Sequence, residues 1–147
     1  MMGSRAGRYV QKAFQELTPG ELHDLLRLRT DVFVVEQACP YPEVDGRDPE
    51  SVHLLRFDDG ELTAYCRWYE EEERTVLGRI VVAGSFRGEG IGRELVEEAL
   101  TRIGPGPVFI SAQSRLEAYY RNLGFRTVGD PYDDFGVLHV PMIRDSK

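Results

Sequence analysis

The chain has 147 residues, of which 41% are hydrophobic and 29% are charged, and this balance predicts one folded domain rather than a disordered segment. Its 25 acidic and 18 basic residues give a formal net charge of -7, which disfavours nucleic acid and anionic membrane surfaces as partners. No apolar run approaches the roughly 20 residues that cross a bilayer, and no apolar signal segment opens the chain. We therefore expect a cytoplasmic protein with a single domain over residues 1–147 and a loose start at 1–8. A homodimer is compatible with these features.

The two cysteines do not form a recognisable metal or redox motif. Cys39 and Cys66 have no CxxC spacing and no neighbouring histidine pair. We expect both to be reduced thiols, with Cys66 in the core, and we expect no metal site.

The first elements are a strand and a capped helix. Val10 to Leu17 has the composition of a strand. Thr18-Pro19-Gly20-Glu21 then has the pattern of a capping box, which predicts the start of a helix. The apolar residues that would form the buried face of this helix are Leu22, Leu25, Leu26, Val32 and Phe33.

Glu36 to Asp48 is predicted to be an irregular loop. Prolines and a glycine between Cys39 and Glu50 exclude regular helix or strand there. Long ordered loops often carry function, so this loop is a candidate wall of a substrate site, with a solvated connector as the alternative.

The middle of the chain predicts three antiparallel strands. Apolar runs over Ser51 to Phe57 and Glu61 to Tyr69 flank Asp58-Asp59-Gly60, which is a hairpin signal. A second polar turn at Glu70 to Arg74 precedes a third strand, Thr75 to Ala83.

The remainder alternates between helix and strand. A helix is predicted from about Ile91 to Ile103, a short strand over Val108 to Ala112, and a second helix that Ser114 would cap and Gly124 would end. The last two strands are expected at Phe125 to Val128 and Val137 to Ile143. Because Pro141 cannot donate a ladder hydrogen bond, the last run needs a bulge or an edge position. The order of elements predicts an α+β domain with a mixed, mostly antiparallel sheet.

A glycine-rich turn between a strand and a helix is the most informative motif. The turn Arg87-Gly88-Glu89-Gly90-Ile91-Gly92 follows the third meander strand and leads directly into the helix. Helix N-termini present unpaired N–H groups and a partial positive charge, and glycine lets the backbone approach phosphate oxygens closely, so this turn suits a pyrophosphate. No Lys-Ser or Lys-Thr follows the glycines, as a P-loop requires, and an antiparallel meander is the wrong setting for a dinucleotide fold.

The turn resembles the cofactor motif [RQ]xxGxG of the GNAT superfamily of acyltransferases, which Arg87, Gly90 and Gly92 match position for position. A second stretch, Tyr119-Tyr120-Arg121-Asn122-Leu123-Gly124-Phe125, resembles a later helix of that family. The resemblance narrows to the ElaA branch on residues that lie mostly in the first half of the chain: Arg29, Val32 to Gln37, Cys39-Pro40-Tyr41, Asp45-Gly46 and His139. It covers the chain from roughly Thr18 to Met142.

The resemblance implies a GNAT fold whose sheet splays between its fourth and fifth strands, with acetyl-CoA as the co-substrate in the splay. The residues that it implies for cofactor binding are Ile80, Val81 and Val82 through their backbone, then Arg87, Gly88, Glu89, Gly90, Ile91 and Gly92, and finally Asn122. It implies an N-acetyltransferase in which a small-molecule or peptide primary amine attacks the thioester directly in a ternary complex.

Four residues are candidates for catalysis, one as the acid and three as the base. The resemblance places Tyr120 near the cofactor sulfur, where a phenol can return a proton to the departing thiolate. The acceptor amine must lose a proton before it attacks, and Glu36, at the start of the irregular loop, is the first candidate for that base or for an anchor of the amine. His139 and His53 are the alternatives to Glu36, although a histidine in a strand is often a core residue. The loop acids that could attract a cationic acceptor, or could simply be solvated, are Glu43, Asp45, Asp48, Asp133 and Asp134.

Two other functions stay open on the sequence. The spacing of Arg29, Phe33 and Glu36 also resembles that of acyl-homoserine-lactone synthases, which would use longer acyl donors. A non-catalytic sensor that binds acyl-CoA and a protein partner is the third alternative.

Overall fold

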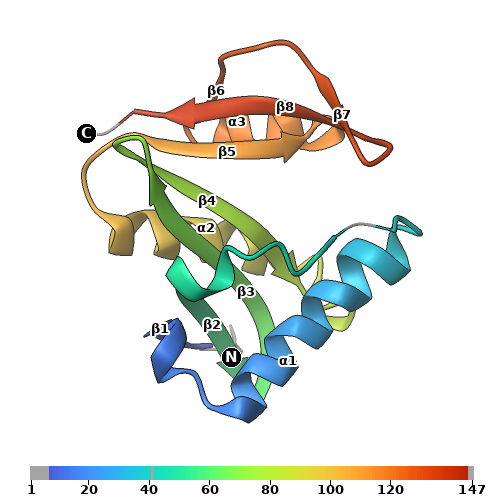
Figure 1. Cartoon of the computed structure of the whole chain (residues 1–147), viewed down its shortest axis with the longest axis vertical. Helices are drawn as coiled ribbons and strands as arrows, with labels where there is room; N and C mark the ends of the chain where they lie inside the picture. Colours follow the sequence, from blue (N-terminus) through green and yellow to red (C-terminus); the bar gives the residue numbers. More distant parts are fainter. Residues whose placement is uncertain (1–6, 41, 146–147) are drawn as a thin grey trace.

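The computed structural model describes residues 7–40 and 42–145 of the chain, and they form one mixed sheet with helices on both faces (Figure 1). The predicted loose start lies mostly outside the described residues, as does Tyr41. The strands are β1 (Arg8–Ala13), β2 (Val52–Asp58), β3 (Glu61–Glu71), β4 (Arg74–Val82), β5 (Val108–Gln113), β6 (Arg126–Thr127), β7 (Tyr132–Asp134) and β8 (Val137–Arg144). The α-helices are α1 (Pro19–Thr30), α2 (Ile91–Ile103) and α3 (Glu117–Asn122).

The sheet order is β1-β2-β3-β4-β5-β8-β6, with β7 paired to the first residues of β8. Every pairing is antiparallel except that of β4 with β5, which is parallel and consists of Thr75 with Val108 and Val76 with Phe109. Beyond these two pairs β4 and β5 diverge, as Figure 1 shows. The predicted α+β sheet with a splay between its fourth and fifth strands is therefore confirmed.

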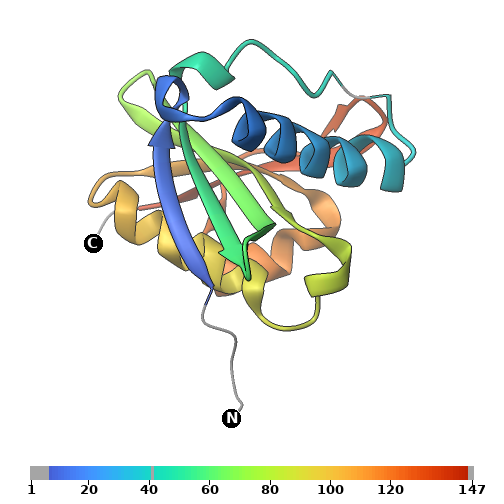
Figure 2. The same cartoon turned by 90° about the horizontal axis from the view of Figure 1, so that it is seen from below.

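Helix α1 covers one face of the sheet, and α2 and α3 cover the other (Figure 2). Adjacent residues of β2 divide between the two cores, because successive side chains of a strand point to opposite faces. Leu55 packs with Leu25 of α1, whereas Leu54 packs with Leu95 of α2. Both faces of the central strands are thus buried, which explains their nearly continuous apolar sequence.

The first helix begins at the predicted capping box. The Thr18 hydroxyl accepts a hydrogen bond from the Glu21 backbone N–H at 3.1 Å, and a Glu21 carboxylate oxygen accepts from the Thr18 N–H at 2.9 Å. After Thr30 the α-helix continues as a π-helical segment, η2 (Asp31–Glu36), which delivers Glu36 to the irregular loop. The loop then runs to the short 3-10 turn η3 (Asp48–Glu50).

Two predicted elements differ from the structure, and the structure has one strand that the sequence did not predict. The first strand ends at Ala13, and a 3-10 turn, η1 (Phe14–Glu16), replaces its predicted end because the Leu17 N–H bonds back to the Phe14 carbonyl. Ser114 does not cap α3: residues Ser114–Leu116 form a separate 3-10 turn, η5, and α3 starts after Leu116 without a side-chain cap. Strand β7 was not predicted, since its Tyr-Asp-Asp sequence has no apolar alternation.

Pro141 lies inside β8, which is an interior strand. Its carbonyl accepts from the Val128 N–H at 2.9 Å, so its ring nitrogen faces the same edge, toward β6 and β7. On that edge the β6 pairing stops at Met142 and the β7 pairing stops at His139. Pro141 therefore occupies the gap between two short partners, where no ladder donor is needed.

No helix among residues 7–40 and 42–145 is long and apolar enough to cross a membrane. Cys39 and Cys66 are both buried free thiols.

Candidate functional site

A cavity of about 860 Å³ opens where β4 and β5 diverge. Its walls come from the last residues of β4, from β5, from the glycine turn, from α3 and from the segment that follows α1. Because β4 pairs with β5 only through Thr75 and Val76, the β4 edge at Ile80, Val81 and Val82 has no strand partner within the described residues and borders the cavity. In the described part of the chain, the backbone hydrogen-bonding groups of this edge are thus without a strand partner, and only the Val82 carbonyl is engaged by a side chain, that of Arg87.

A bulge in β4 bends the strand at the cavity. The register against β3 shifts between Tyr65, which faces Val81, and Arg67, which faces Gly78, so β4 carries one extra residue there. Arg79, in this bulge, has a φ of 52°, in the left-handed region that non-glycine residues rarely adopt. Such bulges re-aim the strand and often occur beside active sites.

The glycine turn presents the N-terminus of α2 to the cavity. Gly88 and Gly90 have φ values of 83° and 78°, which only glycine adopts without strain. The first N–H groups of an α-helix have no intrahelical acceptor, and Gly90, the N-cap of α2, has no side chain that could accept from them. Together with the helix dipole, these N–H groups are suited to an anion. The residues of this region that line the cavity are Arg87, Gly88, Gly90, Ile91, Gly92 and Arg93. Glu89 is exposed and does not line the cavity.

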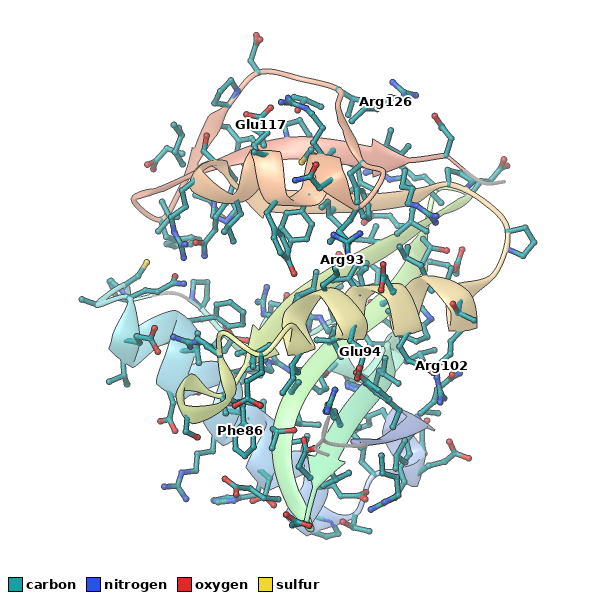
Figure 3. All side chains as sticks on the ribbon, turned by 180° about the vertical axis from the view of Figure 1, so that it is seen from behind. Phe86, Arg93, Glu94, Arg102, Glu117 and Arg126 are labelled. Carbon is teal, nitrogen blue, oxygen red and sulfur yellow. The ribbon has the colours of Figure 1, made fainter. Side chains whose placement is uncertain are left out.

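Helix α2 is fixed in place by its opposite side. Figure 3 shows Arg93 extending from α2 toward α3, whereas Glu94 extends toward the N-terminal part of the sheet. The Glu94 carboxylate accepts from the Tyr9 hydroxyl at 2.7 Å and also pairs with the buried guanidinium of Arg56. These contacts tie the helix to β1 and β2, so its N-terminus is held at the edge of the cavity.

Glu36 and Arg87 form an ion pair at the cavity. Nη1 and Nη2 of Arg87 donate to the two Glu36 oxygens at 2.5 and 3.0 Å, and Nε donates to the Val82 carbonyl at 3.1 Å. The hydrogen bonds from Arg87 lower the pKa of the Glu36 carboxyl, and the charges of Arg87 and Arg115 add to that effect. The candidate base and the cofactor-motif arginine are therefore direct partners, although 51 residues separate them.

Tyr120 lines the cavity from α3 and is 7% exposed. Its ring packs edge-on against Tyr119 and Phe125, and its hydroxyl makes no hydrogen bond to any described residue. Burial raises the pKa of the Tyr120 phenol, so it stays protonated at neutral pH. Asn122, two residues on, does not line this cavity; it borders a separate surface hollow beside Arg93 and Glu97.

His139 lies on the wall formed by β5, β7 and β8. Its ring stacks on Tyr132 at a centroid distance of 6.0 Å, and the Tyr132 hydroxyl contacts the Ser111 hydroxyl. Nδ1 lies 2.8 Å from the Val137 carbonyl, an acceptor only, so Nδ1 carries the proton and Nε2 keeps its lone pair in the neutral ring. All three side chains line the cavity. His53 does not: it is fully buried between Tyr65 and the Asp48 carbonyl.

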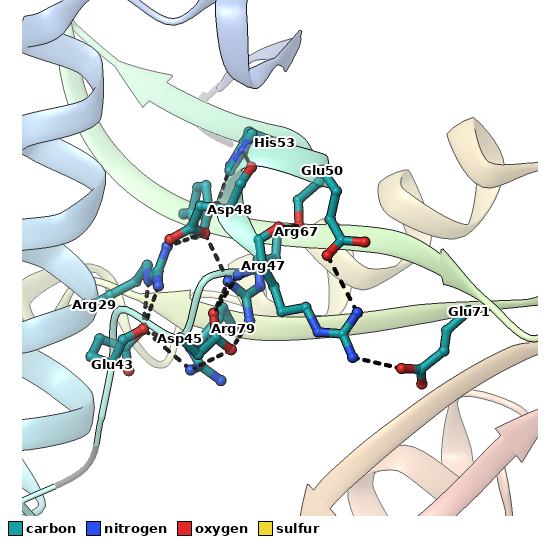
Figure 4. Close-up of polar contacts among 12 residues, drawn as sticks. Arg29, Glu43, Asp45, Arg47, Asp48, Glu50, His53, Arg67, Glu71 and Arg79 are labelled. Carbon is teal, nitrogen blue, oxygen red and sulfur yellow. Dashed lines mark hydrogen bonds and ion pairs between the residues drawn. The ribbon is translucent and has the colours of Figure 1, made fainter.

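The acids of the irregular loop are engaged in a buried ion network rather than solvated (Figure 4). Arg29 donates to Glu43 at 2.6 Å and to Asp48 at 2.8 Å, and Arg67 joins Asp48 to Asp45. Burial opposes the ionised form of Asp45, yet hydrogen bonds from Arg67 and from the backbone lower its pKa to about 2. Arg79, at the β4 bulge, also pairs with Glu43 and Asp45. The proposed attraction of these loop acids for a cationic acceptor is thus weakened, because three guanidinium groups already balance three of them.

Arg67 and Arg79 line the cavity and were not among the predicted site residues. Arg67 stands between Cys66 and Trp68 in the middle of a buried strand, where a charge requires a partner. A charged residue inside a buried strand, together with acidic residues in the loops before and after it, is the sequence signal that could have revealed the network. Within residues 7–40 and 42–145, no cluster of His, Cys, Asp and Glu is arranged to hold a metal ion.

Comparison with known proteins places these features in a family. The model of the acetyltransferase (GNAT) domain matches residues 27–146. A UPF0039 protein of Mycobacterium tuberculosis is 44% identical over 137 residues, or 88% of each chain, and the protein ElaA of Escherichia coli is 38% identical over 139 residues, which cover 88% of this chain and 91% of ElaA. The crystal structure of an acyl-CoA N-acyltransferase from Pseudomonas aeruginosa superposes with a TM-score of 0.89 at 42% identity, covering 95% of this chain and 99% of that one.

Proposed function

We infer that this chain, which belongs to the GNAT family of acetyltransferases, moves an acetyl group from acetyl-CoA to a primary amine by direct attack in a ternary complex. The observation that carries the proposal is the position of the uncapped α2 N-terminus and its glycine turn at one side of a cavity that reaches between β4 and β5. One ligand can thus have its phosphates bound outside the sheet and its reactive end inside it.

The donor is proposed to be a CoA thioester. A GNAT acetyltransferase from Elizabethkingia anophelis has been solved with acetyl-CoA bound, and it shares this fold at a TM-score of 0.65 and 17% identity. In our chain the N–H groups at Gly90 to Gly92 would bind the diphosphate, and the unpaired β4 edge at Ile80 to Val82 would pair with the amides of the pantetheine arm.

Tyr120 is proposed to be the acid. As the amine nitrogen bonds to the carbonyl carbon and the C–S bond breaks, the thiolate sulfur takes the phenolic proton. The proton that the nitrogen loses as the amide forms then returns, directly or through water, to the Tyr120 phenolate. The raised pKa of Tyr120 means that the phenol is protonated in the free protein at neutral pH. Because the hydroxyl has no partner among the described residues, no hydrogen bond within the protein has to break first.

His139 is the better placed of the two candidate bases. The Glu36 carboxylate is bound by Arg87, which lowers its pKa and makes it a weaker proton acceptor. His139 lines the cavity with Nε2 available and Nδ1 anchored to the Val137 carbonyl. We propose that Nε2 accepts the proton of the acceptor ammonium, directly or through water, before the amine attacks.

Direct transfer is favoured over an acyl-enzyme because neither cysteine is placed as a nucleophile. Cys66 is fully buried and its pKa is raised by burial. The Cys39 thiol lines the cavity but donates to the Phe135 carbonyl at 3.0 Å, and a carbonyl cannot take up its proton.

The test is the release of the CoA thiol with a panel of amines, polyamines and peptides. Acetyl-CoA should support turnover that depends on the acceptor, and the purified protein should give little thiol background because its cysteines are buried. Preference for long-chain acyl donors would instead support an activity like that of acyl-homoserine-lactone synthases. Tight CoA binding without turnover on any acceptor would support a sensor and contradict the proposed enzyme.

A further inference from the structure

The Glu36–Arg87 pair joins two parts of the cavity that the proposed reaction would keep separate. Arg87 belongs to the turn that leads to the anion site of α2, whereas Glu36 ends η2 and leads into the irregular loop. The next residues of that loop contact the opposite wall: the Gln37 side chain accepts from Gln113 at 3.2 Å, and Cys39 donates to the Phe135 carbonyl. Glu36 thus lies where the segment after α1 meets the cofactor turn.

The carboxylate of Glu36 uses the same edge of the guanidinium that a phosphate would use. Nη1 and Nη2 each donate to one oxygen of Glu36, and a phosphate group can accept this fork of donors in the same way. Nε meanwhile donates to the Val82 carbonyl, so the guanidinium is held beside the end of β4 and is already oriented.

The pair is also placed where it can be displaced. The Arg87 and Glu36 side chains are 40% and 49% exposed, and ion pairs this exposed contribute little stability. A diphosphate next to the uncapped N-terminus of α2 would bind the helix N–H groups as well as Arg87. Glu36 binds Arg87 but not those N–H groups.

We propose that Glu36 is an internal competitor of the cofactor phosphates: its carboxylate holds Arg87 in the free protein, and the incoming diphosphate of CoA takes its place. The proposal rests on the proposed function, because it assumes that CoA phosphates bind at α2. Once displaced, Glu36 leaves a free carboxylate on the cavity wall, where a cationic acceptor can bind it. Linkage then makes the effect reciprocal, so an acceptor that binds Glu36 also frees Arg87 for the cofactor.

The experiment is calorimetric titration of CoA into the wild-type protein and into Glu36→Gln at low ionic strength. Removing the competing charge should tighten CoA binding by about two- to fivefold, the range expected for an exposed ion pair. The gain should shrink as salt is added. The matched control is Asp31→Asn, which removes an exposed carboxylate from the same segment, η2, that pairs with Arg27 rather than with Arg87. It should leave CoA affinity close to that of the wild type.

A double-mutant cycle separates competition from a general effect of charge. In an Arg87→Gln background Glu36 has lost its partner, so Glu36→Gln should no longer tighten CoA binding. An equal gain in both backgrounds, or no gain in the single variant, would overturn the competitor role while leaving CoA binding intact. Failure of both the wild type and Glu36→Gln to bind CoA would remove the proposed function and this inference together.

Discussion

The hydroxyl oxygen of Tyr119 lies 3.2 Å from the position that a Cβ atom on Gly92 would occupy. The start of α2 and the last helix are therefore in near contact, and Gly92 lacks a side chain at the point where α3 approaches. The glycine turn and the Tyr119-Tyr120 stretch, which are separate motifs in the sequence, form adjoining walls of one cavity.

The first prediction concerns Gly90, at the N-cap of α2. Gly90→Val should weaken CoA binding by roughly tenfold or more, because a branched side chain prevents close approach of phosphate to the backbone. A valine at a φ of 78° also introduces strain, so the control is Gly60→Val in the β2–β3 turn. Gly60 has a φ of 81° and, like Gly90, has nothing within 4 Å of an added Cβ. Calorimetry should show weaker binding only for Gly90→Val; wild-type affinity in that folded variant would refute the diphosphate site.

The second prediction concerns the phenol of Tyr120. Tyr120→Phe keeps the edge-on packing against Phe125 and removes only the hydroxyl, which has no partner among the described residues. An acid role predicts a kcat lower by about 100-fold with CoA affinity nearly unchanged. Tyr119→Phe, one residue earlier on the same helix, shows whether loss of any phenol there has this effect. Equal kcat for Tyr120→Phe and the wild type, when chemistry limits the rate, would leave Tyr120 a packing residue.

The features that the sequence could predict depend on residues that are close together in the chain. The α2 helix begins and ends at the predicted residues because Gly90 and Gly104 sit at its two ends. The hairpin at Asp59-Gly60 forms because both residues adopt positive φ, 53° and 81°, which Asn, Asp and Gly favour. The splay itself came from the family resemblance, and the two-residue pairing of β4 with β5 confirms it.

The features that the sequence could not predict depend on contacts between distant residues. Arg29 finds its partners 14 and 19 residues away, and Glu36 finds Arg87 after 51. Composition alone gives no reason to prefer an ion pair over a solvated side chain at these positions. The short strand β7 forms only because β8 supplies its hydrogen bonds, so no local pattern announces it.

The third prediction separates the two candidate bases. His139→Gln should lower kcat by about 100-fold or more if Nε2 takes the proton of the acceptor, and added imidazole should restore part of the rate. Glu36→Gln should instead act mainly through the KM of the acceptor, because an anchoring charge contributes equally to the ground and transition states. Steady-state kinetics with the first acceptor found measures both. A large loss of kcat in Glu36→Gln, with His139→Gln unaffected, would reverse the assignment.

The fourth prediction concerns the ion network that fixes the irregular loop. Arg29 is fully buried, and its guanidinium binds Glu43 and Asp48, which are 6% and 5% exposed. Arg29→Met keeps much of the side-chain volume but leaves these two buried acids without one of their cations, and the loss of one partner from a buried pair costs about 3–5 kcal/mol. Denaturant unfolding should show a loss of stability of this size.

Arg27→Met provides the matched control, since Arg27 lies on the same helix and its pair with Asp31 is exposed, with a separation of 3.8 Å. Its free energy of unfolding should change by no more than about 1 kcal/mol. Glu43 and Asp45 also bind Arg79 at the β4 bulge, so Arg29→Met should in addition raise the KM of the acceptor. A smaller folded fraction alone would lower the measured rate and leave KM unchanged. If Arg29→Met unfolds no more readily than Arg27→Met, Arg29 does not hold the loop, and the ion pairs of its acids with Arg67 and Arg79 are sufficient to do so.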